Sequence, residues 1–288
     1  MKGPILTEIT DSPARPEGRF SAFRHSSFVR YWIARFLATF GTQILSVAVL
    51  WHIYDLTRDP LYPGLVGLVQ FLPMLLLVLV TGSAADRFGR RLIMGLSIIL
   101  AAICAAGMAW LAYTGEITAA WMLGILSIFG VARAFLGPSS ASLIVSLVPK
   151  EDFANAVTWN SSAWQTATIV GPAVGGLLLG FGEEGFVSFL RSGGNVAAAD
   201  FLDGRGPVVA YSTAFVLIML AAVLIFTIPK PAHASNRERP TLHNMLEGFR
   251  YIWRQKIVLG AVSLDLFAVL MGGVIALLPV YAEEVLHL

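Results

Sequence analysis

The chain has 288 residues, of which 56% are hydrophobic and 13% are charged. A soluble domain carries charge on roughly a quarter of its residues, so this composition excludes most soluble classes and indicates a protein solvated partly by lipid. The same composition excludes intrinsic disorder, and a net charge of +2 without a cluster of Lys and Arg predicts no nucleic-acid binding. Cys104 is the one cysteine, which excludes an internal disulfide.

Long apolar stretches predict transmembrane helices, because about 20 apolar residues in a helix cross a bilayer. Four stretches contain no charged residue, namely 60–85, 92–115, 153–182 and 206–229. Three equally apolar stretches hold one charge each: 31–54 with Arg35, 117–147 with Arg133 and 257–281 with Asp265. Membrane-spanning strands would alternate apolar and polar residues, and these runs do not. The predicted fold class is therefore all-α, a polytopic membrane helical bundle with seven spans.

The distribution of Lys and Arg predicts the orientation of the spans, because positively charged loops stay in the cytoplasm. With the N-terminus inside, fifteen of the 20 Lys and Arg residues fall in inner segments and three in outer segments, Arg58, Arg191 and Arg205. We therefore expect a multi-pass membrane protein with a cytoplasmic N-terminus.

Loop lengths predict four parts: a cytoplasmic tail (1–30), a six-helix bundle (31–229), a cytoplasmic linker (230–256) and a seventh transmembrane helix (257–288). Short connections within the bundle predict antiparallel neighbours. The linker begins with proline and polar residues and then places apolar residues at helical spacing, at Leu242, Met245, Leu246, Phe249, Ile252 and Trp253. This spacing fits an amphipathic helix on the inner membrane surface or a cytoplasmic extension of the seventh helix.

The sharpest local pattern lies in the predicted inner loop between the second and third spans. A glycine at its start allows close helix packing, a later glycine permits a tight reversal, and the acidic and basic residues offer charge-assisted pairing. An ordinary positively charged inner loop has a similar composition. The pattern consists of Gly82, Asp86, Arg87, Gly89, Arg90 and Arg91.

The order and spacing of this loop resemble the signature loop of the major facilitator superfamily, GxLADRxGRR. The sequence departs from it at Ala84, where leucine is usual. The resemblance implies an inner gate whose contacts form in one transport state and break in the other.

A second pattern lies in the fifth predicted span, where Gly171 and Pro172 are followed by Gly175 and Gly176. Proline removes a backbone hydrogen bond, and glycines allow close packing, so the segment is a helix that bends or packs tightly. It resembles the GPxxGG core of the same family's antiporter motif, although Ala167 stands where the fuller motif has a glycine. A packing kink without a specific role is the alternative.

Three charged residues within the spans are candidates for coupling transport to an ion. Arg133 begins an RxxxG element, and burying its guanidinium in hydrocarbon costs at least ~2.5 kcal/mol, so we expect it to face a wet cavity or a partner. The family resemblance implies proton coupling or gating there. Asp265 lies eight residues inside its apolar stretch, where its carboxyl suits proton exchange or fixes helix packing by a hydrogen bond. Arg35 lies near the inner end, within reach of the lipid headgroups.

Four uncharged polar residues at membrane depth, Gln43, Gln70, Asn160 and Gln165, are candidate substrate contacts, with interhelical hydrogen bonding as the alternative. His52 and Asp55 share a face of the first span, but this pair lacks the ligand count of a metal site. No motif for nucleotide hydrolysis, zinc proteolysis or covalent catalysis is present in the sequence. We therefore expect no metal, no cofactor and no enzymatic activity.

Together these motifs resemble a major facilitator transporter over essentially the entire chain, and residues 30–57 and 264–284 look like its enterobactin exporter and drug efflux branch. The resemblance implies a bacterial inner membrane and two six-helix bundles with the substrate between them at mid-membrane. The chain supplies one bundle and one further helix. We expect it to be a fragment whose missing C-terminal half is needed for activity.

The preferred hypothesis is proton-driven export of a small amphiphilic molecule by alternating access, with membrane lipid, substrate and protons as partners. A non-transporting membrane interaction partner and an importer of the same superfamily are the alternatives.

Overall fold

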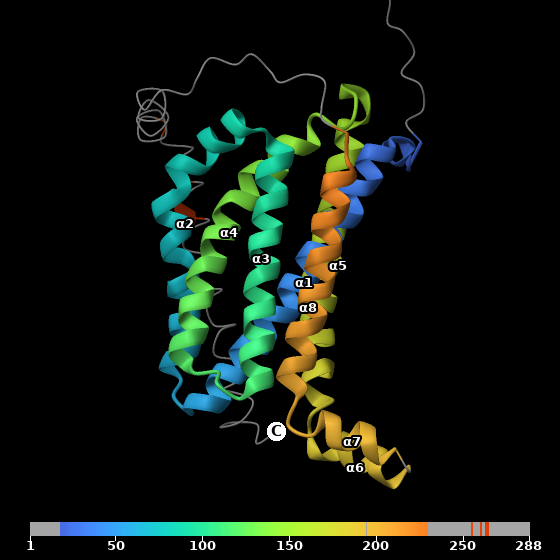
Figure 1. The fold of residues 1–288 in the computed structure, drawn as a ribbon. Coiled ribbons are helices and arrows are strands. Elements are labelled where there is room, and N and C mark those ends of the chain that lie inside the picture. Colours follow the sequence, from blue (N-terminus) through green and yellow to red (C-terminus); the bar gives the residue numbers. More distant parts are fainter. Residues whose placement is uncertain (1–17, 194, 230–254, 256–259, 261–262, 265–288) are drawn as a thin grey trace, which may run out of the picture.

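The computed structural model describes residues 18–193, 195–229, 255, 260 and 263–264, and within them the chain forms helices and no strand (Figure 1). Six helices are long: α1 (Ser26–Thr57), α2 (Leu61–Phe88), α3 (Arg90–Thr114), α4 (Ala119–Ile144), α5 (Phe153–Gly180) and α8 (Gly206–Thr227). Each begins and ends within five residues of one of the first six predicted spans. The predicted fold class is confirmed. The predicted linker helix, most of the predicted seventh span and Asp265 lie outside the described residues.

Four of these helices, α1, α3, α4 and α8, are long and apolar enough to cross a bilayer. Helix α5 is preceded by the short helix η2 (Lys150–Asp152) and followed by α6 (Glu184–Ser192), and the chain bends by 59° between α5 and α6. In α2 the apolar part that the structure describes is Leu61–Leu77. These lengths match the thickness of a bilayer.

The connection from residue 182 to residue 205 joins the fifth and sixth predicted spans and is largely helical. It contains α6 and a second short helix, α7 (Val196–Leu202), which lie together at one end of the bundle (Figure 1). The Arg191 guanidinium lies 2.8 Å from an Asp200 carboxylate oxygen and joins the two helices. The Arg205 guanidinium lies 5.5 Å from the ring centre of Tyr113, which places the start of α8 beside the end of α3.

Helix α1 lies at the centre of the packing and contacts both α5 and α8, while α3 packs on α4 and α8, and α2 packs on α4. The contact of α1 with α8 is close because Gly41 faces Ala214 and Ile218, where an added Cβ would lie 2.8 Å from the Ile218 Cγ1 atom. The Tyr211 hydroxyl donates a hydrogen bond to the Ala48 carbonyl in the same contact, at 3.4 Å. Small residues that let helix backbones approach are typical of packing inside membranes.

The short N-terminal segment that precedes α1, including the helix η1 (Ser21–Arg24), is fastened to the start of α5. Asn155 accepts a hydrogen bond from the Ala22 amide at 3.2 Å and donates one to the Arg19 carbonyl at 3.0 Å. His25 Nε2 lies 2.8 Å from an Asp152 carboxylate oxygen. This hydrogen bond holds the pKa of the Asp152 carboxyl below its usual range.

The Asp152 contact predicts a stability change in acid. Its lowered pKa means that the carboxylate stabilises the fold above the unfolded-state pKa of about 4, and this contribution is lost as the pH falls through the lower folded-state pKa. We expect Asp152→Asn to lower the melting temperature in detergent at neutral pH, with the difference from wild type disappearing in acid. The exposed neighbour Glu151 provides a control, and Glu151→Gln should leave the melting temperature unchanged. A difference for Asp152→Asn that persists unchanged in acid would contradict the assignment.

Candidate functional site

The contact between α1 and α5 is made by the glycines of the fifth-helix motif. A Cβ on Gly171 would lie 2.6 Å from the Gln43 Cβ atom, and a Cβ on Gly175 would lie 3.3 Å from the Ile44 backbone. These two glycines, one helical turn apart, therefore allow the two backbones to approach closely. An added Cβ on Gly176 would meet no atom within 4 Å, and Pro172 lies inside the helix.

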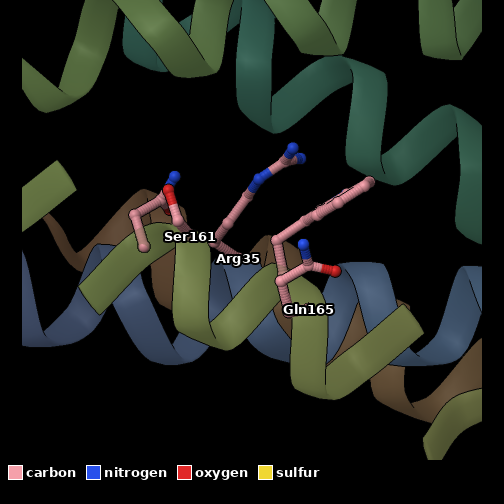
Figure 2. A pocket seen from close by; sticks show the side chains of 5 residues that line it. Arg35, Ser161 and Gln165 are labelled. Carbon is pink, nitrogen blue, oxygen red and sulfur yellow. The ribbon is translucent and has the colours of Figure 1, made fainter. Parts of the chain in front are cut away.

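The close contact brings side chains from α1 and α5 around one pocket of about 400 Å³. Its lining consists of Arg35 from α1 and Asn160, Ser161, Trp164 and Gln165 from α5. In Figure 2 the Arg35 side chain rises from α1 between Ser161 and Gln165. Three of these five residues, Arg35, Asn160 and Gln165, were singled out from the sequence, and the structure brings them together.

Arg35 sits well inside its helix. It lies nine positions after Ser26, the first residue of α1, which is about 14 Å along the helix axis. The predicted span places Arg35 nearer to the helix start, since α1 begins five residues before that span. The Arg35 Nε atom is buried and has no hydrogen-bond partner among the described residues. The Oδ1 atom of Asn160 is buried in the same way. The pocket therefore contains one guanidinium N–H group and one amide oxygen that are buried and that the described part of the protein leaves without hydrogen-bond partners.

The exposed face of α5 is unusually polar for a helix inside a membrane. Its hydroxyls largely bond within the helix, as Thr158 donates to the Ala154 carbonyl at 2.9 Å and Thr166 donates to the Ser162 carbonyl at 2.9 Å. Gln165 is exposed beside them. Exposed polar side chains at this depth are expensive in contact with lipid, so this face fits a water-filled cavity.

A second polar contact joins α4 to α2. Arg133 Nη1 donates a hydrogen bond to Gln70 Oε1 at 3.1 Å. The structure gives Arg133 no carboxylate partner among the described residues, so its charge is met there by a neutral amide. Gly137, the glycine of the RxxxG element, is exposed and has open space where a Cβ would lie.

The loop between α2 and α3 turns tightly at Gly89, which has φ +90°, a backbone conformation that favours glycine. Directly after it, Arg90 donates a hydrogen bond to the Ser142 carbonyl in the last turn of α4, at 2.9 Å. Arg91 donates to the Phe226 carbonyl in the last turn of α8, at 3.0 Å. The two arginines thus satisfy carbonyls that the helix ends leave free. The side chains of Asp86 and Arg87, and the surroundings of Gly82, lie outside the described part.

His52 and Asp55 find separate partners. The His52 Nδ1 atom lies 3.0 Å from the Tyr211 hydroxyl of α8, and the Asp55 carboxylate pairs with Arg58 at the end of α1. Within the described part of the chain, no group of three or more His, Cys, Asp and Glu residues is placed to hold a metal ion.

The sequence profile of the Major Facilitator Superfamily matches residues 31–288. The chain belongs to the major facilitator superfamily. Members of this family are transporters and not enzymes, and the chain is a multi-pass membrane protein of this class.

Curated relatives of the chain include an uncharacterized transporter and a protein named as a multidrug efflux pump. It is 24% identical over 274 residues to the uncharacterized MFS-type transporter YkuC of Bacillus subtilis (strain 168), covering 91% of this chain and 58% of YkuC. It is 27% identical over 266 residues to the multidrug efflux pump Tap of Mycobacterium tuberculosis (strain ATCC 25618 / H37Rv), covering 87% of this chain and 57% of Tap. The chain therefore spans less than three fifths of the length of these relatives.

A solved structure shares the fold. It is a bacterial homolog of the human lysosomal transporter Spinster in an inward-facing and unoccupied conformation, with a TM-score of 0.59 and 20% identity over 80% of this chain and 49% of that one. At this identity the likeness concerns the fold alone.

Two pocket residues, Ser161 and Trp164, were not singled out from the sequence. Both lie one turn from a residue that was, since Trp164 follows Asn160 by four positions and Gln165 follows Ser161 by four. Helical spacing therefore contained the signal, because residues four apart share a face. The spacing alone does not show which helix faces these residues. The Gly171 contact shows that this helix is α1.

The glycine contact predicts unequal effects for two neighbouring substitutions. Gly171→Ala should lower stability by about 1–3 kcal/mol, because the new Cβ overlaps Gln43 across the α1 contact. Gly176→Ala is the matched control, since it adds the same atom to the same helix in open space and should be neutral or slightly stabilising. Melting temperatures of the purified variants in detergent measure both. Equal effects at the two positions would contradict a packing role for Gly171.

Proposed function

We propose that this chain belongs to a proton-driven exporter that moves small amphiphilic molecules by alternating access across a bacterial inner membrane. The N-terminus lies in the cytoplasm, as the excess of positive charge in the inner loops favours. The observation that carries the proposal is the polar pocket beside Arg35, which lies between apolar helices and is open on one side.

Two facts support a transport site over a structural ion pair. The Arg35 guanidinium has no carboxylate partner among the described residues, and the exposed face of α5 is polar where lipid would favour apolar residues. Polar groups placed at membrane depth in this way mark substrate and ion pathways. A second bundle facing this open side would close the pocket, and in our proposal it comes from the part of the family's length that this chain does not span.

Export is favoured by the relatives. One is named a multidrug efflux pump, and another, macrolide efflux protein A of Streptococcus pyogenes, is 26% identical over 152 residues, which is 52% of this chain and 37% of that protein. A pocket that combines a tryptophan, amides and one charge suits molecules with both apolar and polar parts.

Proton coupling is proposed for Arg133 and Asp265. Arg133 keeps its charge at all relevant pH values, so it cannot itself carry the proton. Its fixed charge, met by the amide of Gln70, is suited to holding a carboxylate in its ionised form and to losing that partner when the carboxylate is protonated. We assign the titrating carboxylate to Asp265.

The loop at Gly89 is proposed to act as the inner gate. Arg90 and Arg91 fasten the start of α3 to the ends of α4 and α8, which leaves this corner of the bundle rigid. In the proposal, Asp86 and Arg87 beside it make the contacts with the second bundle that form and break during transport.

Proton coupling is tested in inverted membrane vesicles from the cell that carries the gene. An imposed proton gradient, acidic inside, should drive accumulation of radiolabelled chloramphenicol in wild-type vesicles, because this uncharged aromatic amphiphile does not redistribute passively with pH. Asp265→Asn should abolish this accumulation and keep exchange of labelled for unlabelled substrate, because exchange needs no net proton movement.

The matched control is Asp55→Asn, which removes a carboxylate paired with Arg58 at the end of α1 and should leave both activities unchanged. Unchanged gradient-driven accumulation in Asp265→Asn would remove that residue from the mechanism. Accumulation in right-side-out vesicles alone would show import. No transport in either orientation, together with co-purification of another membrane protein, would favour an interaction partner.

A further inference from the structure

The pocket beside Arg35 has a chemical character that narrows the class of substrate. It combines one guanidinium with neutral hydrogen-bonding groups and one large aromatic surface. None of its lining residues is acidic. Every acidic residue whose side chain the structure describes lies in a connection or near the end of a helix, at positions 55, 59, 116, 151, 152, 183, 184, 200 and 203.

The positive charge of Arg35 therefore has no counter-charge within the described residues. Its Nε atom is buried without a hydrogen-bond partner, and the neighbouring Asn160 Oδ1 atom is equally unsatisfied. Arg35 as a whole is half-buried. A buried guanidinium N–H group without a partner is costly, and a carboxylate is the group that the planar guanidinium fits best. A cationic ligand placed here would instead meet like charge.

The rest of the pocket defines the body of the ligand. Trp164 is 45% exposed and lines the pocket, and an aromatic ring stacks favourably on an indole ring. Ser161 and Gln165 are exposed beside it and can exchange hydrogen bonds with neutral polar groups. A volume of about 400 Å³ lies in the range of small-molecule sites.

We propose that this pocket binds organic anions that carry a carboxylate on an aromatic body, with Arg35 pairing with the carboxylate and Trp164 stacking on the ring. The inference rests on the proposed transport function and adds to it a preference for acidic over neutral or basic substrates. Asn160 and Gln165 complete the site by hydrogen bonds to the same ligand.

The test compares three probes of one shape that differ in charge: 2-naphthoate, the uncharged 2-naphthamide and the cationic 2-naphthylmethylammonium. Isothermal titration calorimetry of the purified chain in a neutral detergent should give at least about tenfold tighter binding of 2-naphthoate than of 2-naphthamide, since a hydrogen-bonded charge pair replaces a neutral contact. The cationic probe should bind most weakly. Failure of 2-naphthoate to bind at millimolar concentration would overturn the proposal.

Substitutions of Arg35 test whether this residue causes the preference for the acid. Arg35→Gln should bind acid and amide equally, whereas Arg35→Lys should keep a reduced preference for the acid because it keeps the charge. Arg58→Gln, which changes an arginine at the far end of α1, is the matched control and should behave as wild type. If Arg35→Gln keeps the full preference for the acid, the proposal is wrong. If Arg35→Gln loses this preference and still binds the amide, the result supports the proposal and shows that the variant is folded.

Anionic lipid carries a similar charge and has to be separated from a soluble ligand. Titration of 2-naphthoate in phosphatidylglycerol mixed micelles should leave its binding intact if the pocket takes aromatic acids. Arg35-dependent binding of phosphatidylglycerol that excludes 2-naphthoate would overturn the proposal. If the vesicles transport substrates without any preference for acids, the inference about aromatic acids is wrong and the proposed exporter function stands. If 2-naphthoate binds in an Arg35-dependent way but no gradient-driven transport occurs, the proton-driven exporter is wrong and the inference about the pocket stands.

Discussion

Close packing of α1 against its neighbours is the contact on which the rest of the described structure depends. In a bilayer the lipid tails are as apolar as the helix surfaces, so helices gain little from hiding apolar side chains and associate through close contact of small residues. Gly41 brings α1 against α8, and Gly171 and Gly175 bring α5 against α1. With α1 held between two helices, the positions of its polar side chains are set relative to both.

The polar groups follow from this packing. Because α5 approaches α1 closely at Gly171, Arg35 and Asn160, which lie two to three helical turns earlier on their helices, come together beside one pocket. Charge in a membrane interior is tolerated only where water, a partner or a ligand meets it. The fold thus places Arg35 and Asn160 beside one pocket, which we propose to be part of a transport cavity, and satisfies the helix ends with Arg90 and Arg91.

Much of the fold could be predicted from the sequence, because bilayer thickness imposes a length on every span and each charge inside a long apolar run is conspicuous. The helix bounds, the turn at Gly89 and the candidate residues Arg35, Asn160 and Gln165 all rest on such local signals. The packing partners could not be predicted in this way. That Gly171 contacts Gln43, or that Arg133 reaches Gln70, depends on which helices are neighbours, and the uniform apolar composition of the spans does not specify this.

Other features were hidden for different physical reasons. Helices α6 and α7 lie in a connection whose composition is that of a loop, and they form because they pack on one another and are joined by the Arg191–Asp200 pair. The sequence places His52 and Asp55 on one face of the first span, yet the partner of His52 is Tyr211, which lies 159 residues away on α8. Contacts across such separations are a property of the assembled bundle.

The central claim is that the exposed polar face of α5 lines a water-filled cavity and does not face lipid. Cysteine labelling measures this directly, because the one native cysteine, Cys104, is buried and can be replaced by alanine. Ser161→Cys in that background should react with a membrane-impermeant maleimide in native membranes, whereas Ile103→Cys, on the exposed apolar face of α3, should not. Equal protection of both positions would contradict the cavity and the transport site built on it.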